Sequence, residues 1–174
     1  HKEKPFALWV SFHESHSPYD FPVEDRNAID ARKFTPPRVG PEDAWQIPKI
    51  FRDLSDDDKR GIIASYYKSA RYLDSTLGQV LGRLTQLGLD DNTFIVYTAD
   101  HGYDLGQHGR FEKHCGYDPA LRIPLIMRMP GKIRQGVVSD FTEHIDLAPT
   151  ILDMLGADPV PVQHGQSLRP YLEN

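Results

Sequence analysis

The stretch Thr93-Phe-Ile-Val-Tyr-Thr-Ala-Asp-His-Gly102 joins an apolar, β-favouring run directly to a polar turn. The run over 93–98 lacks the strict alternation of apolar and polar residues that marks a half-exposed strand. A continuous apolar run of this length is typical of a strand buried on both faces, as in a parallel sheet covered by helices. The stretch therefore predicts a strand that delivers Asp100 and His101 to the edge of a sheet.

A long amphipathic helix is predicted upstream of this strand, over about residues 55–87. Ser55 is a typical N-cap residue, and three aspartates follow it where the helix dipole favours carboxylates. Apolar residues then recur at helical spacing from Ile62 to Leu87, and Gly88 is a typical stop. We interpret the apolar stripe as a face packed on a sheet rather than as a partner-binding surface.

Two further apolar runs, at 6–12 and 123–128, are also predicted to be strands. The order strand, long helix, strand describes a βαβ unit, so the strands at 6–12 and 93–98 are expected to be parallel with a right-handed crossover. A short helix is predicted over 146–155, with Asp146 as its cap and Gly156 as its end, followed by a loop-like tail over 159–174. The pattern as a whole predicts an α/β fold with a mostly parallel sheet flanked by helices.

A proline-rich segment over 18–48 separates the first predicted strand from the helix. It contains six prolines and little periodicity, so we interpret it as a long ordered loop. Loops of this length in compact domains tend to be functional or disordered. A role in shaping a binding pocket and a plain surface crossover are both open at this point.

Composition excludes several classes of protein. The 174 residues fit one domain, and 20 basic against 25 acidic residues leave a net charge of −5. Mean hydropathy is −0.51, and no apolar run approaches the roughly 18 residues of a membrane helix. A single cysteine excludes an internal disulfide or a multi-cysteine metal site. We expect neither a nucleic-acid nor a membrane partner, and the sequence does not indicate an oligomeric state.

Polar clusters follow both predicted βαβ strands. His13 and His16 come after the first strand, and Asp100 and His101 come after the second. Ligands of open parallel sheets collect at the carboxyl ends of the strands. If the strands are parallel, both clusters lie on one edge of the sheet.

Each of these side chains has a chemical and a structural interpretation. Asp100 and His101 offer a carboxylate oxygen and an imidazole nitrogen to a divalent cation, or else form an Asx turn with a hydrogen-bonded histidine. Lys113 suits a phosphate- or sulfate-like anion, or else is a solvated surface lysine. His16 donates to such an anion or bonds a loop carbonyl.

The remaining histidines and the cysteine are assigned more simply. His108 and His114 lie in the same stretch as Lys113 and are candidates for substrate binding. The histidines outside both clusters, at 144 and 164, are expected to be structural. Cys115 belongs to no recognisable nucleophile motif, so a buried thiol is the expected role.

Taken together, these stretches resemble the sulfatases of the alkaline-phosphatase superfamily, in particular the iduronate- and carbohydrate-sulfatase members, with phosphonate monoester hydrolases close behind. The resemblance follows the family's order over nearly the whole chain. It rests on Thr98-Ala-Asp-His-Gly-Tyr-Asp-Leu-Gly-Gln-His-Gly109, on Lys113, and on residues 121–126 and 129–131. Residues 13–19, 72–74 and 144–150 support it.

The resemblance implies an alkaline-phosphatase-like fold and a role for each matching residue. Asp100 and His101 match the family's second pair of metal ligands, for a cation that is usually calcium, with magnesium, manganese or zinc as alternatives. Lys113 matches the lysine that binds the sulfate and the leaving-group side, and His16 matches the histidine that contacts the sulfate or leaving oxygen. The implied catalytic residues are His16 and Lys113, and the implied partner is a sulfated small molecule or carbohydrate.

The sequence also departs from the family pattern. Sulfatases place a first metal-binding aspartate pair and a Cys-x-Pro-x-Arg segment, whose cysteine becomes formylglycine, before the matching region. Cys115 stands in Cys-Gly-Tyr-Asp-Pro and does not fit that segment. We therefore expect residues 1–174 to be a single partial catalytic domain that is incomplete in this chain, inactive alone, and preceded by the nucleophile segment.

Three functions remain open on this sequence. The first is metal-dependent hydrolysis of a sulfate ester by a larger enzyme. The second is phosphonate monoester or phosphodiester hydrolysis on the same scaffold. The third is a non-catalytic fragment that binds anions.

Overall fold

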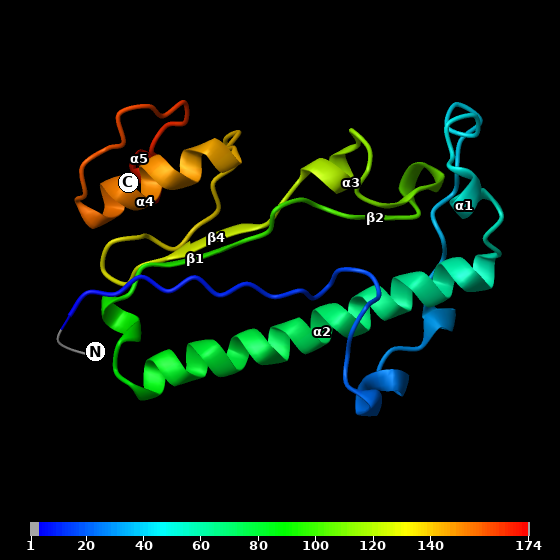
Figure 1. Ribbon diagram of the computed structural model, residues 1–174, viewed down its shortest axis with the longest axis horizontal. Helices are drawn as coiled ribbons and strands as arrows, with labels where there is room; N and C mark the ends of the chain where they lie inside the picture. The colour runs from blue at the N-terminus through cyan, green and yellow to red at the C-terminus, as the bar shows by residue number, and fades with distance from the viewer. Residues whose placement is uncertain (1–3, 174) are drawn as a thin grey trace. The chain divides into compact units, whose positions relative to one another are not determined.

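The computed structural model describes residues 4–173, which form two compact units. Unit 1 comprises His1–Asp90 and Tyr97–Leu125, and unit 2 comprises Asp91–Val96 and Ile126–Asn174. The helices are α1 (Lys49–Arg52), α2 (Asp56–Gln86), α3 (Asp118–Leu121), α4 (Leu147–Leu155) and α5 (Arg169–Glu173), and the strands are β1 (Ile95–Thr98), β2 (Asp104–Leu105), β3 (Phe111–Glu112) and β4 (Leu125–Arg128) (Figure 1).

The strands form two small sheets. β1 pairs with β4, and both lie inside runs that the sequence predicts to be strands. β2 pairs with β3 in antiparallel register, with Asp104 opposite Glu112 and Leu105 opposite Phe111. The α/β class is confirmed, but no sheet within residues 4–173 has more than two strands.

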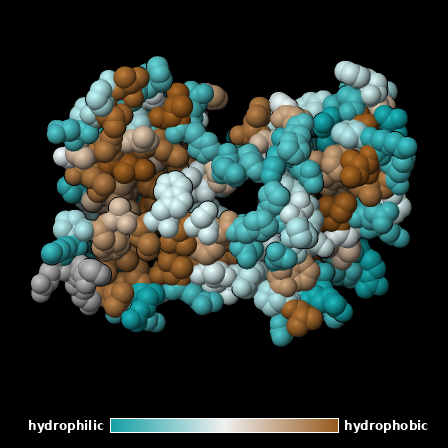
Figure 2. Space-filling view, viewed as in Figure 1, coloured by the Kyte–Doolittle hydropathy of each residue, from teal (hydrophilic) through white to brown (hydrophobic). Residues whose placement is uncertain are grey.

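The strand predicted over 6–12 is wrong for the described residues. The segment carries no strand and pairs with nothing in residues 4–173. Its apolar side chains face solvent: Trp9 is 88% exposed and Leu8 is 71% exposed. A strand is defined by hydrogen bonds to a neighbour, so a β-favouring sequence stays merely extended when no neighbour is supplied. Exposed hydrophobic side chains are also visible on the face in Figure 2.

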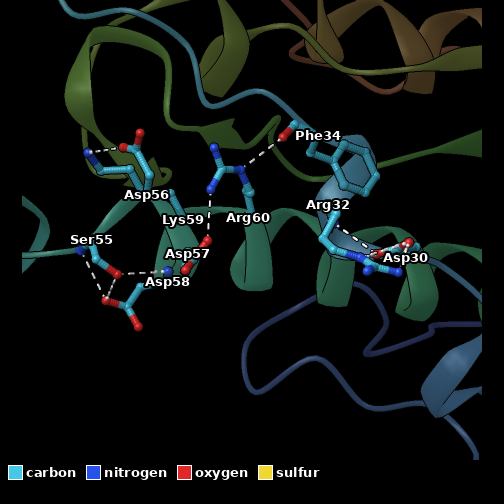
Figure 3. Close-up of polar contacts among 9 residues, drawn as sticks. All are labelled: Asp30, Arg32, Phe34, Ser55, Asp56, Asp57, Asp58, Lys59 and Arg60. Atoms are coloured by element: carbon cyan, nitrogen blue, oxygen red, sulfur yellow. Dashed lines mark hydrogen bonds and ion pairs between the residues drawn. The ribbon is translucent and has the colours of Figure 1, made fainter.

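Helix α2 forms as its sequence predicts. Ser55 and Asp58 make a capping box: the Ser55 hydroxyl accepts the Asp58 N–H at 3.1 Å, and the Asp58 carboxylate accepts the Ser55 N–H at 3.0 Å (Figure 3). At the other end Gly88 has φ +64° and donates its N–H to Thr85. Both ends of the helix are therefore fixed by local sequence.

Few apolar side chains are fully buried. A compact protein of 19.8 kDa exposes about 8,600 Å², and two separate compact units of these sizes expose about 10,000 Å². The chain exposes 12561 Å², so its residues bury less surface than self-contained domains of this mass. The buried apolar residues are Ile63, Ala64, Phe111 and Ala120 in unit 1 and Met154 and Leu168 in unit 2.

Unit 2 is built around α4. The helix ends at Gly156, whose φ of +67° is the left-handed cap that the sequence predicts. Asp146 does not cap α4 with its side chain; its carboxylate accepts the N–H groups of Glu143 and Gln166, each at 2.9 Å. The loop-like tail is wrong in part, because α5 forms within it. Among the described residues, no helix has the length and apolar character needed to span a membrane.

Candidate functional site

The site is organised around a contact between His16 and Lys113 in unit 1. The Lys113 Nζ lies 2.7 Å from His16 Nε2, although 97 residues separate the two in sequence. His16 Nδ1 lies 2.6 Å from the Ser17 carbonyl oxygen, which can only accept, so Nδ1 holds a proton. The Nε2 lone pair is then left to accept from the lysine ammonium. The carbonyl bond expected as one interpretation of His16 is therefore present, and its role toward an anion stays a prediction.

The β2–β3 hairpin places Lys113. The lysine follows β3 directly, and the hairpin is closed by pairing of Leu105 with Phe111 and by a bond from the Gly106 N–H to the Arg110 carbonyl at 2.8 Å. Phe111 is 4% exposed and packs edge-to-face on Phe51, with ring centroids 5.7 Å apart. A buried aromatic ring two positions before the lysine therefore fixes where its stem begins.

Asp100 and His101 lie together, directly after β1. The Asp100 Oδ1 accepts the His101 N–H at 3.0 Å, and Asp100 Oδ2 is 3.6 Å from His101 Nε2. His101 Nδ1 lies 2.7 Å from the Gly102 carbonyl, so this nitrogen also holds the proton and Nε2 presents a lone pair. A carboxylate that is 87% exposed beside such a lone pair is a donor set that fits a divalent cation. Within residues 4–173, no third carboxylate, histidine or cysteine joins the pair.

Gly102 is required by close packing rather than by its backbone angle. Its N–H donates to the Ala120 carbonyl at 2.8 Å, and the Tyr103 N–H donates to the Pro119 carbonyl at 2.6 Å. A Cβ on Gly102 would collide with the carbonyl oxygens of Pro119 and Arg122. The third residue of the Asp-His-Gly triplet thus lets helix α3 lie against the turn that carries the two candidate ligands.

Two tyrosines join the loop that carries His16 to the loop that carries His101. The hydroxyls of Tyr19 and Tyr103 are 2.8 Å apart, and both rings contact Tyr66 of α2 at centroid separations of 6.0 and 5.1 Å. Burial raises the pKa of both hydroxyls, so both stay protonated at neutral pH. Among residues 4–173, the His16–Lys113 pair makes no direct hydrogen bond or ion pair with the Asp100–His101 pair, and the tyrosine bond links their two loops.

His108 is bound by the proline-rich segment. Its Nδ1 lies 2.9 Å from the Asp43 carboxylate, and its ring stacks on Tyr117 with centroids 3.8 Å apart and planes 8° apart. This bond lowers the pKa of Asp43. Arg110 strengthens the same attachment by donating to the Gln46 carbonyl at 2.9 Å. His108 therefore anchors a loop in this structure, and its role in substrate binding stays a prediction.

His114 and Cys115 occupy the end of this stretch. His114 is exposed, and its carbonyl accepts from Arg110 at 3.2 Å. The Cys115 thiol is partly buried and donates to the fully buried Asp104 carboxylate at 2.9 Å. Burial raises the pKa of the thiol and of the Asp104 carboxyl. A thiol held protonated against a carboxylate is a poor nucleophile, in keeping with the absence of a nucleophile motif around it.

Sequence reasoning missed Asp43, Tyr19 and Tyr103. Each acts through a partner 65 or 84 residues away, and no local spacing encodes such a pair. For the two tyrosines the sequence offers only an indirect indication, because polar and aromatic residues concentrate at 13–19 and 103–117. Nothing comparable indicates Asp43.

Comparison with known proteins identifies the family to which the chain belongs. The sulfatase family profile matches residues 1–157. The chain belongs to the sulfatase family. It is 41% identical over 132 residues to an N-acetylglucosamine-6-O-sulfatase of Bacteroides thetaiotaomicron, covering 75% of this chain and 22% of that protein. It is 34% identical over 149 residues to the iduronate 2-sulfatase of Mus musculus, covering 74% and 27%.

Solved structures place the chain in the same superfamily fold. A phosphonate monoester hydrolase from Silicibacter pomeroyi superposes with a TM-score of 0.81 at 34% identity, covering 91% of this chain and 35% of that one. A structure bound to its substrate D-glucosamine-2-N,6-O-disulfate superposes with a TM-score of 0.64 at 38% identity, covering 67% and 24%. The sulfatase chain described here spans about a quarter of the length of these curated relatives.

Proposed function

We propose that this sulfatase chain is part of an enzyme that hydrolyses a sulfate ester, with His16 and Lys113 at the sulfate group. The observation that supports this most is the 2.7 Å contact between Lys113 Nζ and His16 Nε2. A lysine and a histidine from opposite ends of unit 1 meet there, and membership of the sulfatase family makes a sulfate ester the natural substrate.

The two side chains divide the chemistry. The Lys113 ammonium neutralises charge on the sulfate oxygens and on the leaving-group oxygen as the ester bond breaks. His16, with Nδ1 bonded to Ser17, presents Nε2 as the atom that exchanges a proton with the leaving alcohol. Both groups must be positioned before the substrate arrives, and the hairpin and the tyrosine bond supply that positioning.

Asp100 and His101 are the residues that we propose hold a divalent cation. A carboxylate and an imidazole fit calcium, with magnesium, manganese or zinc as alternatives. Bound there, the cation would polarise sulfate oxygens. The other half of its ligands, and the formylglycine nucleophile, are proposed to come from residues outside 1–174. Residues 1–174 alone are therefore expected to hydrolyse no sulfate ester.

The proposed substrate is a sulfated carbohydrate. One relative is an N-acetylglucosamine-6-O-sulfatase, and one matching structure holds D-glucosamine-2-N,6-O-disulfate as its substrate. These substrates belong to those proteins, and they define the first compounds to assay here.

Phosphonate monoester hydrolysis is the second candidate. The phosphonate monoester hydrolase from Silicibacter pomeroyi covers 91% of this chain with a TM-score of 0.81. An ammonium, an imidazole and a divalent cation serve phosphonate oxygens as well as sulfate oxygens, so assays must separate the two reactions.

The test is a comparison of substrates and variants in the full-length protein. We expect hydrolysis of glucosamine 6-sulfate and of an aryl sulfate to exceed that of an aryl phosphonate monoester, to stop on chelation and to return with Ca²⁺. Asp100→Asn should lower kcat/KM by at least about 10- to 100-fold, the loss that follows even when an outer partner of a metal ligand is removed. The exposed Asp140→Asn is the matched control. Faster phosphonate hydrolysis would favour the second candidate, and full activity of Asp100→Asn would refute the metal assignment.

A further inference from the structure

A polar cavity lies in unit 1 and shares no residue with the candidate site. It has a volume of about 410 Å³. Its walls come from two short 3-10 helices, η1 (Val23–Asn27) and η2 (Ala31–Lys33), and from α2. The lining residues are Arg26, Asn27, Ile29, Asp30, Ala31, Arg32 and Lys68.

The charge of this cavity is opposite to that of the chain. Arg26, Arg32 and Lys68 contribute three cations, and Asp30 is the single carboxylate in the lining. The chain as a whole carries −5. Cations gathered into one concave site of an acidic protein attract anions more strongly than the same charges spread over a surface.

The Asp30 carboxylate is paired with Arg32. Arg32 Nε and Nη2 donate to the Asp30 oxygens at 3.0 and 2.9 Å, and the Arg32 N–H donates to the same side chain at 3.0 Å (Figure 3). These bonds lower the pKa of Asp30 to about 2, so it stays ionised and balances Arg32. Within residues 4–173, Arg26 and Lys68 have no carboxylate partner; Lys68 Nζ lies over the Phe21 ring at 5.5 Å.

The wall of the cavity is held on α2. Phe34, next to η2, stacks on Tyr67 with centroids 5.2 Å apart, and its carbonyl accepts from Arg60 Nε at 3.3 Å (Figure 3). At the other end of the wall, Arg71 lies 3.9 Å from the Asp25 carboxylate. Because both short helices are attached to α2, the cations face a preformed cavity, which lowers the entropy lost when a ligand binds.

We infer that this cavity binds a sulfate or carboxylate group of an anionic oligosaccharide, on a sugar other than the one whose ester is cleaved. The inference rests on the proposed function, because that function brings a polyanionic carbohydrate to the protein. In this assignment Arg26 and Lys68 donate to the oxyanion, Asn27 bonds sugar hydroxyls, and Ile29 contacts the ring, since all four residues line the cavity. The volume lies within the usual range of ligand sites, about 300–1,000 Å³.

The test measures binding of a heparin-derived tetrasaccharide to the full-length protein by calorimetry, in a Lys113→Ala background that stops turnover. Each exposed ion pair contributes up to about fivefold to a binding constant. Replacing Arg26 and Lys68 together by Gln should therefore raise the Kd by roughly tenfold or more at low salt. The matched control is Lys33→Gln, which removes an exposed cation of η2 outside the cavity lining and should leave the Kd unchanged. Added salt should reduce the difference between the variants.

A second measurement separates this site from the catalytic one. In the otherwise native protein, Arg26→Gln with Lys68→Gln should raise KM for the tetrasaccharide and leave kcat for an aryl sulfate unchanged. Tetrasaccharide binding that is insensitive to both substitutions would overturn the inference, as would inorganic sulfate binding as tightly as the tetrasaccharide. If no sulfate ester is hydrolysed at all, the proposed function fails, while the binding measurement still decides whether the cavity takes the oligosaccharide.

Discussion

Two segments of unit 1 differ sharply in packing, and the more apolar of the two, 6–12, is the less buried. The segment 103–117 makes contacts along its whole length. Tyr103 is hydrogen-bonded to Tyr19, His108 to Asp43, and Phe111 is buried against Phe51. The segment 6–12 has no paired strand within residues 4–173, and Trp9 is 88% exposed.

The difference shows which interactions these residues can complete among themselves. A hairpin needs only its own two arms and a turn, and its side chains then contact partners on α1 and on the proline-rich loop. A single β-favouring run needs a neighbouring strand, and residues 4–173 supply none for 6–12. Contacts within residues 4–173 therefore fix the geometry around Lys113, whereas the apolar side chains of 6–12 stay exposed.

The largest expected effect separates these two segments directly. In residues 1–174, Phe111→Ala should cost about 3–5 kcal/mol of unfolding free energy, because it leaves a cavity beneath the hairpin. Trp9→Ala should cost less than about 0.5 kcal/mol, as surface substitutions do. Urea denaturation followed by circular dichroism measures both. Equal losses from the two substitutions would contradict the comparison.

A smaller effect is expected from the tyrosine bond. Tyr19→Phe and Tyr103→Phe should each cost about 1 kcal/mol, and the double variant should cost little more than Tyr103→Phe, because the same Tyr19–Tyr103 hydrogen bond is lost in all three. Tyr67→Phe is the matched control, since no partner of its hydroxyl is found among the described residues. Fully additive losses in the double-mutant cycle would show that the two hydroxyls do not interact.

The smallest effect is a change in acid sensitivity. The pKa of Asp43 is lowered chiefly by its bond to His108, from the ordinary value of 3.8. A lowered carboxyl pKa contributes stability that is present above 3.8 and is lost as pH falls through the folded-state value. Asp43→Asn should therefore flatten the loss of stability between pH 4 and pH 2, measured by urea midpoints, while Asp53→Asn should not. An unchanged acid slope would refute the coupling.

Much of the fold was predictable where the signals are local. The Ser55 cap, the apolar spacing of α2 and the Gly88 stop fix that helix, and Gly156 ends α4. The pairing of His16 with Lys113 was reachable only through resemblance to the sulfatases, because 97 residues separate them. Asp43 and Tyr103 were not reachable, since their partners are fixed by packing of distant loops. The run 6–12 was misread because β propensity does not reveal whether a partner strand is present.

The most direct test of the proposed site is a double-mutant cycle on His16 and Lys113 in the full-length protein, read as kcat/KM for a sulfate ester. Removing one donor to developing negative charge costs about 10²- to 10³-fold elsewhere. We predict losses of that size for His16→Ala and for Lys113→Ala, with the double variant no slower than about the worse single, because the two side chains act as one unit. Lys132→Ala should keep the native rate. Losses that multiply in the double variant, or native rates in either single variant, would contradict the account.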